Sequence, residues 1–151
     1  DYKIDRLTGI VRALRKDLAS GFTESFQELV RGELFDDFLE MAEHLLGEEY
    51  KDAAAVIIGA SLETHLKKMC LKNDIAIDET TLNGKTRTKK ADTLNAELAQ
   101  KEIYLKLDQK YITAWLGLRN SAAHGDYGKY TKEQVQLVLN GVREFIARFP
   151  S

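Results

Sequence analysis

The chain has 151 residues, which suits a single domain with a hydrophobic core of its own. Its formal net charge of -2 excludes a surface that is basic all over, so any nucleic-acid contact must come from a local patch. A lone cysteine, Cys70, excludes an internal disulfide and favours a reducing compartment such as the cytoplasm.

The composition favours helices, because 44% of the residues are hydrophobic and Pro150 is the one proline. We predict an all-α fold, a compact bundle of about five or six helices in one domain over residues 1–151. The chain begins at Asp1 without a methionine, so we expect a fragment of a longer protein. Its three histidines are scattered, so we predict no metal site and no cofactor. No apolar run is long enough to predict a membrane span.

The first predicted helix carries a narrow apolar stripe with residues three and four positions apart. The stripe consists of Ile4, Leu7, Val11, Leu14 and Leu18. It favours packing against an antiparallel neighbour or a partner helix. Gly21 is expected to end this helix, and Thr23 can cap a second helix that runs to about Leu46.

The third predicted helix, from Asp52 to Lys72, is the most apolar and is therefore expected at the centre of the bundle. Glu63 extends its small-residue face. The favoured interpretation is an i,i+4 ion pair with Lys67, and the alternative is a supporting role at a functional site. His65 is predicted to be a partly buried packing residue.

Residues 73–90 are predicted to be one long irregular segment with a turn at Asn83-Gly84. The segment contains four cations within six residues and no acid between them: Lys85, Arg87, Lys89 and Lys90. Such a run is usually solvated surface. In a long loop of a near-neutral protein, it is also a candidate for contact with phosphate groups. No aromatic residue interleaves it, so base stacking is not predicted.

A short helix capped by Asp92 is expected next, followed by a helix that begins near Leu107. The latter carries an apolar stripe at helical spacing and is predicted to be buried along it: Tyr111, Trp115, Leu118 and Ala122. Gly125 is its natural stop. Asn120 and His124 are four residues apart and share a helix face, and Arg119 lies one position round. The alternative for these three residues is an ordinary helix cap with a surface ion pair.

The turn after His124 is expected to hold Tyr127 and Tyr130 close to this motif. Thr131 and Gln134 form a capping box that begins the last helix.

A guanidinium and an imidazole at one helix end suit phosphodiester cleavage. The arginine stabilises charge on the phosphate, and the histidine moves a proton. RNA supplies its own nucleophile, the 2′-hydroxyl, so no metal-activated water is required. Transesterification needs both a base and an acid, and a symmetric dimer would supply two histidines. The small residues that we expect at such an interface are Thr113, Gly117, Asn120 and Ser121.

The segment Leu118 to Gly125 resembles the HEPN domains, all-helical modules of prokaryotic toxins, antiphage systems and RNA-processing enzymes. Their signature is an arginine, usually followed by a polar residue, then a histidine after four to six residues. The resemblance implies a metal-independent endoribonuclease that acts as a homodimer. It implies catalytic roles for Arg119 and His124, an orienting role for Asn120, and a possible antitoxin or associated domain as partner. Lys85, Arg87, Lys89, Lys90 and Tyr127 are then the candidate RNA-binding residues, with Glu63 and Ser121 in support.

Three interpretations stay open: an RNA-cleaving domain of toxin or defence biology, a non-catalytic HEPN module for nucleotide or RNA binding or dimerisation, and a plain helical interaction domain. The intact Arg-Asn and His favour the first, although loss of catalysis in some HEPN domains means that the fold alone does not establish activity.

Overall fold

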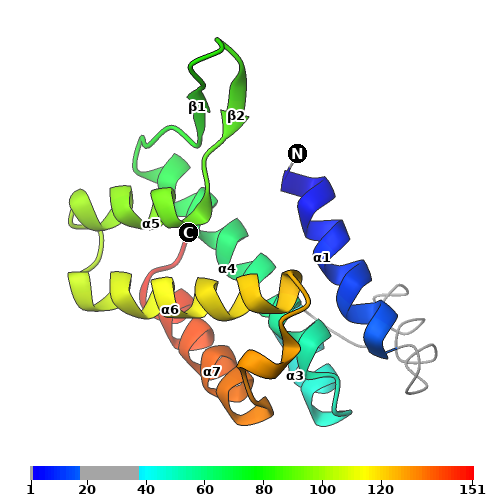
Figure 1. The fold of residues 1–151 in the computed structure, drawn as a ribbon. Coiled ribbons are helices and arrows are strands. Elements are labelled where there is room, and N and C mark those ends of the chain that lie inside the picture. The colour runs from blue at the N-terminus through cyan, green and yellow to red at the C-terminus, as the bar shows by residue number, and fades with distance from the viewer. Residues whose placement is uncertain (1, 18–37) are drawn as a thin grey trace.

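The computed structural model describes residues 2–17 and 38–151, without the side chains of residues 2, 4 and 13–17. In chain order its elements are α1 (Tyr2–Asp17), α3 (Phe38–Gly47), α4 (Lys51–Lys72), β1 (Asp78–Thr80), β2 (Thr86–Thr88), α5 (Ala91–Gln100), α6 (Lys106–Ala123), the short 3-10 helix η2 (Tyr127–Lys129) and α7 (Lys132–Arg148). Helices dominate, so the predicted all-α bundle is confirmed (Figure 1). The expected boundary between the first two helices, at Gly21 and Thr23, lies outside the described residues.

Helix α4 is the centre of the bundle, as its apolar sequence predicts. It packs against α1, α3, α5, α6 and α7, and every residue from 52 to 60 is buried. In Figure 1 it runs behind α6, with α1 beside it. None of the helices in the described part of the chain is both long and apolar enough to cross a membrane.

Helix α1 meets α4 and α6 at Gly9, whereas two residues of its predicted apolar stripe are exposed. Leu7 and Val11 are 61% and 52% exposed. Gly9 is buried instead: a Cβ built on it would lie 3.4 Å from both Val56 Cγ1 of α4 and Ala123 Cβ of α6. A glycine lets two helices approach closely, and this contact sets how α1 docks on α4 and α6.

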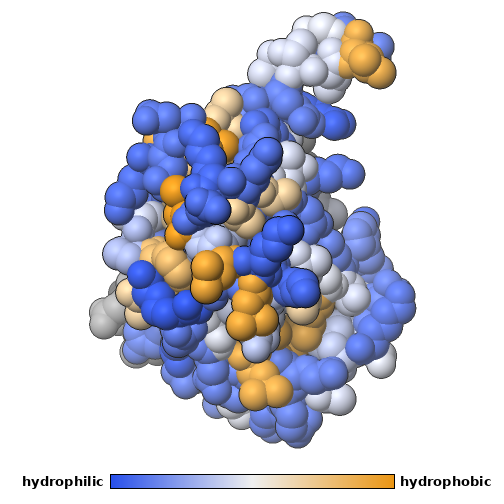
Figure 2. Space-filling model, turned by 90° about the vertical axis from the view of Figure 1, so that its left-hand side faces the viewer, coloured by the Kyte–Doolittle hydropathy of each residue, from blue (hydrophilic) through white to orange (hydrophobic). Residues whose placement is uncertain are grey.

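Residues 78–88 form a short hairpin, which corrects the prediction of a wholly irregular segment. The strands β1 and β2 are antiparallel, with Glu79 opposite Arg87. Gly84 adopts φ +75° in the turn, and the Asn-Gly signal is thus explained by a hairpin turn. Figure 2 shows the hairpin standing clear of the body with apolar atoms at its tip, where Leu82 is fully exposed.

Helix α6 buries most of its predicted apolar stripe, but not all of it. Its buried apolar residues are Ile112, Leu116 and Ala122, whereas Tyr111 is 53% exposed. Trp115 and Leu118 are half-buried and pack against the core, so the prediction is wrong only for Tyr111. The helix has apolar residues on two faces, and periodicity alone does not tell which of them is buried more deeply. Beside the buried residues runs what we call the outer stripe, at spacings of four, three and four, which is exposed except for the half-buried Leu118: Leu107, Tyr111, Ala114 and Leu118. Figure 2 shows apolar atoms gathered at the end of the body where α6 begins.

The last helix and His65 follow the sequence predictions. Thr131 accepts a hydrogen bond from the Gln134 N–H, and the Gln134 side chain accepts one from the Thr131 N–H, so the capping box is present. His65 is buried against Phe145 and bonds the Phe149 carbonyl through Nε2 at 2.6 Å.

Candidate active site

The motif helix α6 ends in a turn that requires glycine. Gly125 adopts φ +84°, and its N–H donates to the Ala122 carbonyl at 3.3 Å. The Asp126 N–H donates to the Ser121 carbonyl at 2.8 Å. These two bonds make a Schellman motif, so the predicted stop at Gly125 is confirmed. His124 is the cap residue and is exposed at the helix end.

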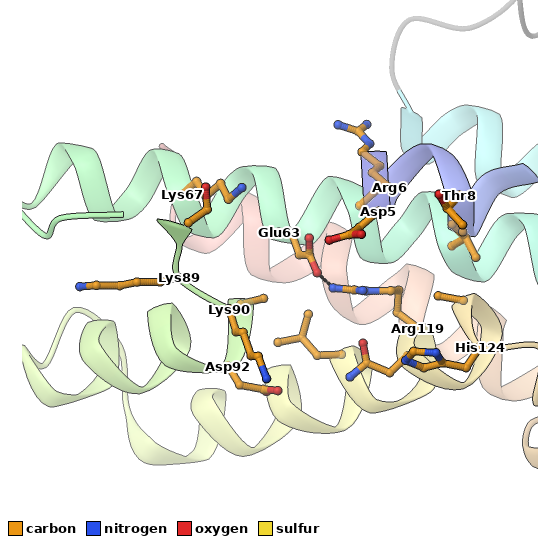
Figure 3. A pocket seen from close by; sticks show the side chains of 18 of the residues that line it. Asp5, Arg6, Thr8, Glu63, Lys67, Lys89, Lys90, Asp92, Arg119 and His124 are labelled. Carbon is orange, nitrogen blue, oxygen red and sulfur yellow. Dashed lines mark ion pairs between the residues drawn. The ribbon is translucent and has the colours of Figure 1, made fainter. Parts of the chain in front are cut away.

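The three motif residues line one cleft, whose volume is about 990 Å³. Its walls come from α1, α4, Asp78 of β1, the segment 86–92 and α6. Figure 3 shows Arg119 pointing across the cleft towards α4, with His124 near one end and Lys67 and Lys89 towards the other. Asn120 also lines the cleft. Ser121 is half-buried and is not among the lining residues. The fold therefore brings the motif together with the cationic segment that follows the hairpin turn.

The side chain of Arg119 packs against α4 at Gly59, and we call this contact the seat of Arg119. A Cβ built on Gly59 would lie only 2.5 Å from Arg119 Cβ and 3.1 Å from its Cδ, so the arginine side chain occupies the space that glycine leaves. Its guanidinium forms an ion pair with Glu63, whose side chain is 9% exposed (Figure 3). The structure thus corrects the predicted partner of Glu63: the carboxylate pairs across helices with Arg119 rather than along α4 with Lys67.

Helix α1 contributes a wall of the cleft and is tied to the motif by two hydrogen bonds. Arg12 Nη1 donates to the Ala123 carbonyl at 3.0 Å. The Tyr127 hydroxyl donates to the Arg12 carbonyl at 3.0 Å, so this tyrosine holds α1 in place and is not among the residues that line the cleft. Tyr130 is buried, and its hydroxyl donates to Asp52 at 2.5 Å. Tyr127 therefore lies next to the motif without lining the cleft, whereas Tyr130 is buried against α4 and does not face the site.

The four predicted RNA-binding cations differ in their position relative to the cleft, in their exposure and in their ion pairs. Lys90 lines the cleft at the start of α5, whereas Lys85 is exposed at the hairpin turn and does not line it. Arg87 pairs with Glu79 at 2.7 Å and remains 60% exposed, and such a surface pair is weak enough to exchange for a phosphate. Lys89 is only 12% exposed and donates to both carboxylate oxygens of Glu97 at 2.9 Å, so it mainly anchors the hairpin to α5.

The cleft collects positive charge although the chain is slightly acidic. Among the residues that the structure describes, seven Lys or Arg side chains line it against four Asp or Glu side chains: Arg6, Arg12, Lys67, Arg87, Lys89, Lys90 and Arg119 against Asp5, Glu63, Asp78 and Asp92. Burial lowers the pKa of Lys67, and the nearby Arg6 lowers it further, while Asp78 partly offsets both effects. An anion in the cleft would relieve this repulsion between neighbouring cations.

Two parts of the site were missed by the sequence predictions. Gly59 carried a usable signal, because a glycine inside a long helix costs about 1 kcal/mol relative to alanine and needs a packing reason. No sequence signal identified Arg12, since its place in the cleft depends on how α1 docks.

Among the residues that the structure describes, no three His, Cys, Asp or Glu side chains gather closely enough to hold a metal ion. Comparisons with protein-family models, with curated proteins and with solved structures find no match for this chain. Function is therefore inferred from the cleft.

Proposed function

We propose that this domain is a metal-independent endoribonuclease of the HEPN type, with Arg119 and His124 as catalytic residues. The observation that carries the proposal is the cleft itself. It joins an arginine seated on α4, an exposed histidine at a helix end and cations from three further segments. Phosphodiester transfer needs charge stabilisation and proton transfer at one place, and these residue types supply both. The resemblance of the motif to HEPN domains implies a role in toxin or antiphage defence.

Each motif residue then has a distinct task. Arg119, oriented by its ion pair with Glu63, presents its guanidinium to the phosphate that gains charge in the transition state. His124 transfers a proton to or from the reacting oxygens, and Asn120, which lines the same cleft, orients the substrate. The 2′-hydroxyl of RNA gives up its proton to a base and attacks the adjacent phosphorus, the bond to the 5′-oxygen breaks, and the 5′-oxygen takes up a proton from an acid as it leaves.

A second copy of the chain supports this chemistry because one histidine cannot be acid and base in the same step. The outer stripe of α6 gives that copy a surface to bind. Leu107 and Tyr111 are 60% and 53% exposed, and a Cβ built on the adjacent Gly117 meets nothing within 4 Å. The Gly117 and Ser121 of the predicted thin face border this stripe. We expect the stripe to pack against its symmetry mate, which brings two motif helices together.

The proposed reaction predicts a specific substrate requirement. The protein should cleave RNA in EDTA and leave a 2′,3′-cyclic phosphate, because the nucleophile belongs to the substrate. A matched oligonucleotide with one 2′-deoxy residue at the cut site should be inert at that site. Gel analysis of the two substrates, with product ends identified by mass spectrometry, measures this. Cleavage of the deoxy substrate, or loss of RNA cleavage in EDTA, would contradict the mechanism.

The dimer also makes a prediction. Ala114→Arg, in the middle of the outer stripe, should yield monomers by light scattering at micromolar concentration and should lower RNA cleavage in parallel, because a charge is buried without a partner. Ala147→Arg places the same charge on an exposed position of α7 and should change neither property. A monomeric wild type that cleaves RNA at full rate would refute the shared site.

A non-catalytic RNA- or nucleotide-binding module is the second candidate. It is favoured by the ion pair between Arg119 and Glu63, since a guanidinium that is already paired gains less from a phosphate. An RNA-binding wild type that cuts no RNA under the conditions above would select this function.

A further inference from the structure

The His124 end of the cleft holds a second guanidinium that the motif does not contain. Arg12 of α1 lines the cleft together with Ala123 and His124. Its Nη1 donates to the carbonyl of Ala123, the residue that immediately precedes His124. Because Gly9 packs against Ala123, α1 crosses directly over the end of the motif helix, and this fixes which residue of α1 stands beside the histidine.

The backbone of Arg12 is held as firmly as its side chain. The Tyr127 hydroxyl donates to the Arg12 carbonyl at 3.0 Å, from the turn that follows the motif. The Schellman turn satisfies the carbonyls of Ser121 and Ala122, and Arg12 satisfies the next carbonyl, that of Ala123. Arg12 is thus oriented by two contacts with the segment that carries His124, and such preorganisation is what a binding residue requires.

Among the described residues, the charges around this end of the cleft favour an anion. In Figure 3 the labelled carboxylates Asp5, Glu63 and Asp92 all lie to the left of His124. Asp126, which is close to His124 in the sequence, forms an ion pair with Lys129 at 3.2 Å. A guanidinium has five N–H donors. Arg12 uses one of them, on Nη1, for the Ala123 carbonyl, so the group still offers donors suited to phosphate oxygens.

We infer that Arg12 is a further substrate-binding residue, which holds an RNA phosphate beside His124 while Arg119 binds from the α4 side. This role rests on the proposed cleavage of RNA and extends it: α1 is part of the substrate site. The site is then a clamp of two guanidiniums from different helices, with the histidine at the end near Arg12.

Binding is measured in the His124→Ala background, so that it is separated from chemistry. A fluorescent RNA oligonucleotide is titrated at several salt concentrations. Arg12→Gln should weaken affinity about 10- to 100-fold, as expected for loss of a charge-assisted hydrogen bond. It should also reduce the slope of log affinity against log salt by about 0.7, the value for one phosphate contact on a single strand. Arg12→Lys should keep the slope but recover only part of the affinity, because an ammonium lacks the guanidinium fork.

Two controls distinguish substrate binding from a structural role. Lys3→Gln removes the same charge from an exposed position of α1 outside the cleft and should leave the salt slope unchanged. Tyr127→Phe loosens the orientation of Arg12 but removes no charge, so it should weaken affinity while the slope stays the same. An unaltered slope in Arg12→Gln would overturn the inference, whatever the affinity. A wild type that binds RNA but does not cut it would refute the proposed catalysis, whereas the change in slope for Arg12→Gln would still establish the Arg12 contact.

Discussion

His124→Ala should lower the rate of RNA cleavage roughly 10²- to 10⁴-fold, the usual contribution of a general acid or base. The same substitution should cost less than about 1 kcal/mol of stability, because the imidazole is exposed at a helix end and the turn is held by backbone bonds. Single-turnover cleavage and urea denaturation measure the two quantities. The large effect on rate with a small effect on stability is the signature of a catalytic group and not of a cap.

Arg119 provides the matched comparison for His124. Arg119→Ala should also lose cleavage, by roughly 10²- to 10³-fold, because an anion-stabilising donor is removed. Arg119→Lys should recover little, since a point charge does not reproduce bidentate contact with a phosphate. Asn120→Ala should reduce the rate less than either, because it only orients. If His124→Ala cleaves as fast as the wild type, the proposed mechanism is wrong.

Gly59→Ala should inactivate the enzyme from a position that no substrate touches. The new methyl group would overlap the Arg119 side chain, because a Cβ at this position lies 2.5 Å from Arg119 Cβ. Arg119 would have to leave its seat and its partner Glu63, and cleavage should fall nearly as far as in Arg119→Ala. Overpacking costs about 1–3 kcal/mol, which exceeds the gain of about 1 kcal/mol from replacing a helical glycine with alanine. We therefore expect the variant to be less stable as well as inactive.

A control for Gly59→Ala is Gly47→Ala, at the end of α3. A Cβ on Gly47 meets nothing within 4 Å, so this variant should retain activity and stability. Cleavage by Gly59→Ala at the wild-type rate, in a protein that remains folded by circular dichroism, would show that the seat of Arg119 is unimportant for the reaction.

The sequence by itself determined the local features of the fold. The boundaries of α7 follow from a capping box, and the end of α6 follows from Gly125, because these signals act within a few residues. The central position of α4 follows from an apolar run that leaves it no polar face, and the grouping of Arg119, Asn120 and His124 follows from helical spacing.

The tertiary structure decided everything that depends on which elements meet. The partner of Glu63 is Arg119, an ion pair across two helices that spacing along α4 could not reveal. The pattern of α6 could not show that Tyr111 stays exposed while Ile112 and Leu116 are buried, because apolar residues lie on more than one of its faces. The place of Arg12 beside His124 exists only because α1 crosses α6 at Gly9. Such contacts join residues far apart in the chain, and local periodicity carries no information about them.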